Sequence, residues 1–339
     1  MKALKKAAVF AAVMALAASL LAGCSGSGSD YNAHAAVATY GDTQIPAYEA
    51  SYYIRTLQYT YEYIYGYENL WDAEIQEHVT MADMVNEMAL KEVYQTYVLM
   101  DQAQQLGLEL DEEQEAAVQA AVDSFMDTYP LPVYNAIGVE EDELYNVFEH
   151  NALAMLAYEY AIADVDTNVT QEEARRCAVS VISLYDSSTT YNAEDLKDDI
   201  MERLDAGIDM ASAKDEFSSY SIVLSTYTVG AGDFESSFGP AAMELQEGEY
   251  TAVYSETIGA WYIIYCDSYM DEDATEAGYA EVISDREDAL FEESYAGWKA
   301  AAPEFTVNAS VLATIDYSHT MYMDVQLVEN PDYDVDSGS

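Results

Sequence analysis

The stretch that decides the fold of this chain runs from Arg175 to Asp267, where strand and helix patterns alternate. The patterns are, in order, a strand at 179–184 (VSVISL), helices at 193–204 and 210–217, a Gly-rich turn at 230–234 (GAGDF), a short Ala-rich helix, and two closing strands that include 250–254 and 259–264 (GAWYII). β-Branched and aromatic runs favour the strands, and glycines mark the turn. The order predicts a small domain of mixed strands and helices.

The flanks of this stretch have a different pattern. Residues 37–46 predict a short strand, a turn at Gly41 and the start of a helix. Apolar periodicity then predicts helices at 47–64, 81–106, 112–129, 140–162 and 276–301, and a strand at 305–307. Thr170, followed by Glu173, is typical of a helix start. We therefore expect a mostly helical region on either side of the mixed domain.

Tyrosine is unusually frequent, with 31 residues, and Tyr59, Tyr63 and Tyr67 recur at helical spacing. Such a stripe commonly packs in a core with its hydroxyl groups at the edge. The alternative is an exposed stripe that holds unfolded segments through flat aromatic contacts.

The first residues indicate export. Lys2, Lys5 and Lys6 precede an apolar run from Ala7 to Leu21, which is the form of a secretory signal. Residues 21–24 (LAGC) resemble the lipobox of bacterial lipoproteins, in which the cysteine is lipidated and becomes the first residue. We expect a signal peptide at 1–23, a lipid on Cys24, a flexible tether at 24–35, and a protein on the extracytoplasmic face of the cell membrane. The alternative for Cys24 is a free thiol beside an uncleaved anchor.

The charge excludes one class of partner. With 63 acidic and 12 basic residues the formal net charge is −51, so the surface repels nucleic acid and anionic lipid heads. The four histidines are scattered and no metal-ligand spacing occurs, so we expect no metal and no cofactor. Cys177 and Cys266 fall in the first and last strands of the mixed domain, where they are either buried free thiols or a disulfide.

The order of elements in 175–267 resembles the parvulin module of peptidyl-prolyl isomerases. Residues 37–55 (VATYGDTQIPAYEASYYIR) and 291–308 (FEESYAGWKAAAPEFTVN) resemble the opening and closing segments of secreted foldases of the PrsA and SurA type. The resemblance implies an α+β protein with a parvulin-like antiparallel sheet-and-helix domain inserted into a SurA-like helical domain. Its parts would be a helical domain at 36–166, the inserted domain at 170–272, a returning helix and strand at 273–308 that pack on the helical domain, and an acidic tail at 309–339.

The resemblance also implies a site. Rotation about an X–Pro amide has a barrier of roughly 18–20 kcal/mol, and a catalyst must bind the twisted amide best. Parvulins use an apolar cup for the proline ring, and here Phe238, Phe234 and Met243 match it. They line the amide with two histidines and a Cys or Asp, whose places match Ser180, Tyr262 and Ser225, although the register at Ser180 allows a slip by one.

These residues have alternative readings. The two phenylalanines would otherwise fill the core, and Ser180 and Tyr262 would be ordinary strand residues of a domain that has lost activity. An open cup at Phe234, Phe238, Ser180 and Tyr262 would favour a foldase, and a cup plugged by Trp261 or Tyr265 would favour a non-catalytic module.

We therefore expect a membrane-anchored foldase or chaperone that binds unfolded, Pro-containing secreted polypeptides, with weak or lost isomerase activity. The alternative is a non-catalytic surface lipoprotein that acts as a binding or scaffold module. The sequence leaves the oligomeric state open.

Overall fold

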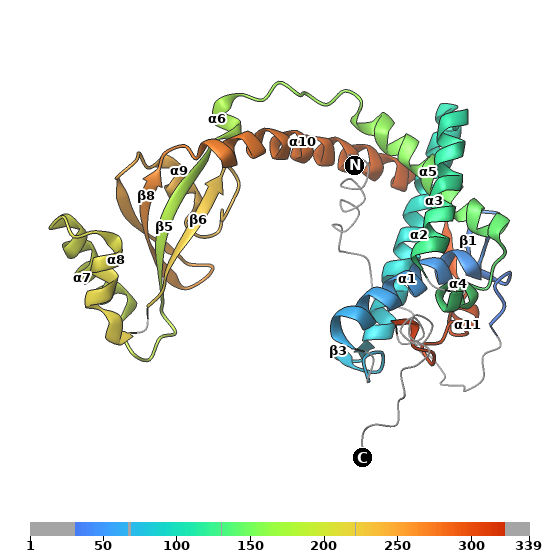
Figure 1. Cartoon of the computed structure of the whole chain (residues 1–339), viewed down its shortest axis with the longest axis horizontal. Helices are drawn as coiled ribbons and strands as arrows, with labels where there is room; N and C mark the ends of the chain where they lie inside the picture. Colours follow the sequence, from blue (N-terminus) through green and yellow to red (C-terminus); the bar gives the residue numbers. More distant parts are fainter. Residues whose placement is uncertain (1–30, 67–68, 130, 221, 323–339) are drawn as a thin grey trace, which may run out of the picture. The chain divides into compact units, whose positions relative to one another are not determined.

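The structure is a computed structural model that describes residues 31–66, 69–129, 131–220 and 222–322 (Figure 1). The predicted signal peptide, Cys24, most of the tether and the end of the acidic tail lie outside the described residues. The chain forms two compact units, one from Tyr158 to Gly297 and the other from the residues before and after. We call them the sheet unit and the helical unit. None of the helices in the described ranges is long and apolar enough to span a bilayer.

The sheet unit contains a four-stranded antiparallel sheet in the order β6-β5-β8-β7. Its elements are α6 (Gln171–Ala174), β5 (Arg176–Tyr185), α7 (Ala193–Asp205), α8 (Met210–Glu216), a 3-10 turn (Ser218–Tyr220), β6 (Leu224–Gly230), α9 (Gly239–Glu244), β7 (Tyr250–Ser255), β8 (Ala260–Ser268) and most of α10 (Glu272–Ala301). The predicted start at Thr170 is confirmed, because Thr170 and Glu173 form a reciprocal capping box.

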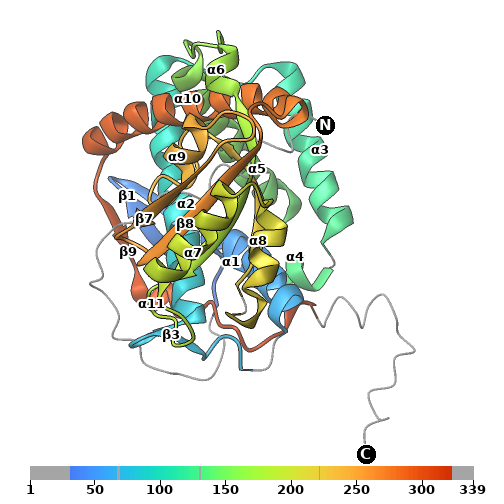
Figure 2. The same ribbon diagram turned by 90° about the vertical axis from the view of Figure 1, so that its left-hand side faces the viewer.

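Two cores lie on opposite faces of this sheet. Cys177, Val179 and Val181 of β5 pack on one face against residues of α9. Ile182 and Leu184 pack on the other face against α7 and α8, which lie over the strands in Figure 2. Side chains alternate along a strand, so β5 is apolar at nearly every position because it serves both cores.

One strand of the sheet was not predicted. No strand was predicted for residues 224–230 (LSTYTVG), yet they form β6, which pairs with β5 from Leu224 to Gly230. Its hydroxyl residues hid the alternation, since only Val229 and Gly230 are fully buried. The β-branched and aromatic residues 226–229 were the available signal.

The helical unit combines a helical cluster with a three-stranded sheet in the order β2-β1-β9. Its elements are β1 (Ala36–Tyr40), β2 (Thr43–Pro46), α1 (Ala47–Tyr65), β3 (Glu74–Gln76), β4 (Val79–Thr80), α2 (Met81–Leu106), α3 (Glu112–Thr128), α4 (Leu131–Ile137), most of α5 (Glu141–Ile162), β9 (Phe305–Val307) and α11 (Ala309–Leu312). Strand β9 returns from the far end of the chain and pairs with β1. Together, the two units form the α+β architecture that the sequence predicts.

Some of the tyrosines are buried and others are exposed. Tyr48 and Tyr97 are buried in the helical unit, and Tyr52 packs between Phe125 and Phe148. By contrast, Tyr63 and Tyr65 at the end of α1 are 65% and 66% exposed.

Part of the predicted acidic tail packs on the helical unit. Ile315 and Met321 are only 2% and 1% exposed, and the ring of Tyr317 stacks on Trp71 with centroids 4.5 Å apart. The apolar side chains between 315 and 322 give this segment a core face, and it packs on the helical unit as an ordered strap. Residues 315–322 lie within the predicted acidic tail at 309–339 and are packed on the helical unit.

A close backbone contact in the sheet unit gives a stability prediction. A Cβ atom at Gly278 in α10 would lie 2.2 Å from the backbone oxygen of Ala174, whereas at Gly297 in the same helix no heavy atom lies within 4 Å. We expect Gly278→Ala to lower the free energy of unfolding by about 1–3 kcal/mol. We expect Gly297→Ala to raise it by up to about 1 kcal/mol through helix propensity. Urea unfolding of both variants measures this, and equal effects would contradict the close packing of α10 on α6.

Candidate functional site

The strand register decides which of the predicted site residues share a face of the sheet. Tyr262 of β8 lies opposite Ser183 of β5, and Ser225 of β6 lies opposite Val181. Directly opposed residues in an antiparallel pair point to the same face. Since Ser183 and Val181 are two positions apart on β5, Ser225 and Tyr262 both lie on the α9 face.

Ser180 lies on the other face. It is opposite Tyr265, and its hydroxyl donates a 2.8 Å hydrogen bond to Oδ2 of Asp267. The predicted grouping of Ser180 with Tyr262 is therefore not seen. The sequence allowed a slip by one residue at Ser180, and such a slip exchanges the two faces of a strand. The hydroxyl that lies opposite Tyr262 is that of Ser183.

An aromatic group lies where the proline cup was expected. The ring of Phe238 is 3% exposed and contacts three others, with centroid distances of 5.3 Å to Tyr262, 5.2 Å to Tyr227 and 4.6 Å to Phe234. Phe234 is stacked over Phe238 at an interplanar angle of 18° and is itself 41% exposed. We call these four residues the aromatic site. Phe238 forms its floor and Phe234 its exposed surface.

The backbone of the turn fixes the position of Phe234. Its φ angle is +50°, which is uncommon for a bulky residue and requires support from its surroundings. Asp233 accepts a 2.8 Å hydrogen bond from the Gly230 amide through Oδ2, and the Gly239 amide donates to the Phe234 oxygen at 3.2 Å. A Cβ at Gly239 would lie 1.7 Å from the Asp233 oxygen, so the turn closes tightly on the start of α9. The strained backbone thus holds Phe234 over Phe238.

The electrostatics of the aromatic site are those of an apolar surface. Burial raises the pKa of the Tyr262 phenol, so it stays neutral at physiological pH. Ser225 and Ser183 are half-buried hydroxyls on the same face. In the described ranges no group of His, Cys, Asp and Glu could hold a metal ion. Such a surface suits an apolar ring or aliphatic side chain and offers no group for proton transfer.

Trp261 and Tyr265, which would plug the cup in the alternative reading, do not reach it. Both pack in the core under α7 and α8, on the opposite face from Tyr262. The ring of Phe238 is instead covered by Phe234 and Tyr227. The site is therefore neither the open cup nor the plugged cup that the sequence suggested.

Met243 and the two cysteines lie further along the same core. Met243 Sδ is 3.8 Å from Cys177 Sγ, and its backbone oxygen accepts a 2.7 Å hydrogen bond from Arg175. Cys177 and Cys266 are both buried and both free. Of the two readings of this pair, the structure has the free thiols.

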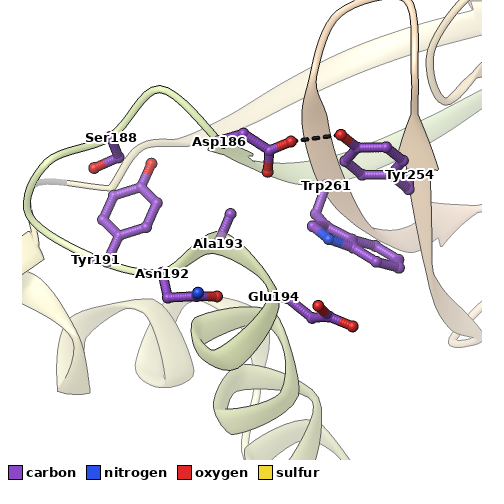
Figure 3. Close-up of a pocket in the computed structure, with 8 residues that line it drawn as sticks. All are labelled: Asp186, Ser188, Tyr191, Asn192, Ala193, Glu194, Tyr254 and Trp261. Atoms are coloured by element: carbon purple, nitrogen blue, oxygen red, sulfur yellow. Dashed lines mark hydrogen bonds between the residues drawn. The ribbon is translucent and has the colours of Figure 1, made fainter.

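A separate cavity of about 590 Å³ lies at the end of the sheet, on the α7 face (Figure 3). It is lined by Asp186, Ser188, Tyr191, Asn192, Ala193, Glu194, Tyr254 and Trp261. The Tyr254 hydroxyl donates to Asp186, which bridges the end of β5 to β7, as the dashed line in Figure 3 shows. No pattern in the sequence indicated this cavity, because its residues come from the loop after β5 and from α7, β7 and β8.

Thiol reactivity tests the burial of the cysteines. Burial raises the pKa of the Cys266 thiol to about 11 and that of Cys177 above its ordinary value. Because the thiolate is the reactive form, we expect both to react with a disulfide reagent at pH 8 at least about tenfold more slowly than in the urea-unfolded chain. Fast reaction of either thiol in the folded protein would contradict this packing.

Comparison with known proteins gives matches among solved structures alone, since no protein-family model and no curated protein matches the chain. The peptidyl-prolyl isomerase PrsA from Bacillus cereus is similar at 18% identity and a TM-score of 0.38, over 72% of this chain and 97% of that one. The foldase PrsA from Streptococcus pneumoniae has 14% identity and a TM-score of 0.31, over 75% and 97%. A SurA-like chaperone from Campylobacter jejuni has 9% identity and a TM-score of 0.30, over 81% of this chain and 99% of that one. The solved structures that this chain is similar to are thus PrsA-type isomerases and SurA-like chaperones.

Proposed function

We propose that this protein is an extracytoplasmic foldase, anchored to the membrane through a lipid on Cys24, that binds unfolded secreted polypeptides. Its sheet unit would bind Pro-containing segments with weak or no isomerase activity. The observation that carries the proposal is the aromatic site, in which an exposed Phe234 is held by a strained turn over the buried Phe238.

The binding half of the proposal rests on the exposed aromatic surface. Phe234 is 41% exposed, and Tyr185, at the end of β5 on the same face, is 46% exposed. Flat aromatic rings bind proline rings and aliphatic side chains without demanding one sequence. A turn held in place binds with little loss of conformational entropy, which suits a site for many polypeptides.

The weak catalytic half rests on what surrounds the rings. Binding the twisted amide better than the planar forms needs polar groups at the amide. Tyr262 is 6% exposed and packs on Phe238, and Ser180 lies on the opposite face. A proline ring also reaches Phe238 only if Phe234 moves aside. The arrangement therefore favours binding of a polypeptide over catalysis of its X–Pro isomerisation.

A peptide assay tests the catalytic half. We expect the full chain to accelerate cis–trans exchange of a short X–Pro peptide by less than about tenfold over buffer, since Tyr262 is buried against Phe238 and Ser180 lies on the opposite face. Protease-coupled kinetics or NMR exchange measures the rate. Fast turnover that Phe238→Ala abolishes would show that this half of the proposal is wrong.

An aggregation assay tests the binding half. We expect the full chain to delay aggregation of a reduced, unfolded secreted protein, and Phe234→Ala to weaken its affinity for that client by about tenfold through lost apolar contact. Tyr160→Ala, which removes a 54% exposed ring on α5, is the matched control and should change nothing. If the chain ignores unfolded clients and binds one folded partner instead, the scaffold lipoprotein is the better account.

A further inference from the structure

One face of α1 carries a buried polar ladder. Arg55, Gln58 and Glu62 follow one another at helical spacing and are 6%, 0% and 1% exposed. Arg55 Nη1 donates to Gln58 Oε1 at 2.7 Å, and Gln58 Nε2 donates to Glu62 Oε1 at 2.9 Å. Buried charged groups are costly unless they are hydrogen-bonded, so the partners of the ladder show its use.

The partners are main-chain groups of the strap, which we define as residues 315–322. Arg55 Nη1 donates to the oxygen of Asp316 at 2.7 Å, and Gln58 Nε2 donates to the oxygen of His319 at 2.8 Å. Glu62 Oε2 accepts from the amide of Tyr322 at 3.0 Å. The ladder therefore contacts every third residue of the strap through its backbone. Any residue offers the carbonyl groups, and any residue except proline offers the N–H group.

Aromatic rings flank the ladder. Trp71 donates to Glu62 Oε1 at 3.0 Å and stacks on Tyr317. Tyr322 packs edge-on against Tyr59 and Tyr63, with centroids 5.9 and 5.4 Å apart. Tyr63 is still 65% exposed despite this contact. Ile64 and Tyr65, which follow it, are 59% and 66% exposed, so the exposed surface continues past the rings that Tyr322 contacts.

The strap leaves one group of the ladder unsatisfied. Arg55 Nε is buried and has no hydrogen-bond partner among the described residues. A buried guanidinium N–H without an acceptor is rare and costly. The strap therefore does not satisfy every donor of the ladder.

We propose that Arg55, Gln58, Glu62, Tyr59, Tyr63 and Trp71 form a groove for an extended polypeptide segment, and that the strap occupies it as an intramolecular ligand. The proposal deepens the proposed function, on which it rests, by naming the main-chain mode of client binding. A client that displaces the strap gains the same three main-chain contacts and can reach the exposed rings of Tyr63 and Tyr65. The strap in turn limits binding to clients that can compete with it. The apparent affinity for a client falls in proportion to the fraction of molecules whose groove is free of the strap.

Tyr322→Pro in the full chain tests this. Proline removes the amide that donates to Glu62 and the ring that contacts Tyr59 and Tyr63, without touching the groove itself. We expect affinity for a fluorescent, carboxymethylated unfolded protein to rise by about tenfold, the effect of losing one charge-assisted hydrogen bond from the competing strap. Tyr160→Ala should leave the affinity unchanged. A folded Tyr322→Pro protein with unchanged or weaker affinity overturns the proposal.

A second measurement needs no change to the strap. The chain has three tryptophans, so Trp261→Phe with Trp298→Phe leaves Trp71 as the sole reporter. We expect client binding to shift its emission to longer wavelength, because Tyr317 leaves the ring. If the client binds and the emission of Trp71 stays unchanged, the groove proposal fails and the foldase proposal stands. If the client does not bind at all, both fail.

Discussion

The alternation of β5 between two cores is the constraint on which the sheet unit depends. Val179 and Val181 pack under α9, while Ile182 and Leu184 pack under α7 and α8. A shift of one residue would turn every one of these side chains to the wrong core, so packing fixes the register. That register puts Tyr262, Ser183 and Ser225 on the face of the aromatic site and leaves Ser180 on the other. The register thus decides which polar side chains lie beside the aromatic site.

Both units have exposed aromatic rings, which are held in place by different interactions. In the sheet unit, a strained turn holds Phe234 exposed above Phe238. In the helical unit, a polar ladder on α1 binds backbone atoms between two sets of aromatic rings. Exposed aromatic surface promotes self-association, and a formal net charge of −51 opposes it through repulsion between copies. Repulsion between copies thus limits self-association through the exposed aromatic rings.

How much could be read from the sequence depended on whether the signals were local. Helices α2 and α3 begin where expected, because each has a capping box at its start. Thr80 pairs with Asp83 in α2, and Asp111 pairs with Gln114 in α3. Phe238 was found through its neighbours in the chain, and it does lie at the floor of the aromatic site. The face of Ser180 was not predictable, since it depends on pairing with β6 and β8. The ladder was beyond reach, because Arg55 and Asp316 are 261 residues apart and a mid-helix arginine gives no sign of burial.

Amide hydrogen exchange would show whether the aromatic site binds unfolded Pro-containing segments. The full chain would be measured with and without a saturating unfolded, Pro-containing polypeptide. The account predicts slower exchange in the turn at 230–238 and at the end of β5, where Phe234 and Tyr185 are exposed. Binding of the polypeptide with unchanged exchange at both places would contradict it.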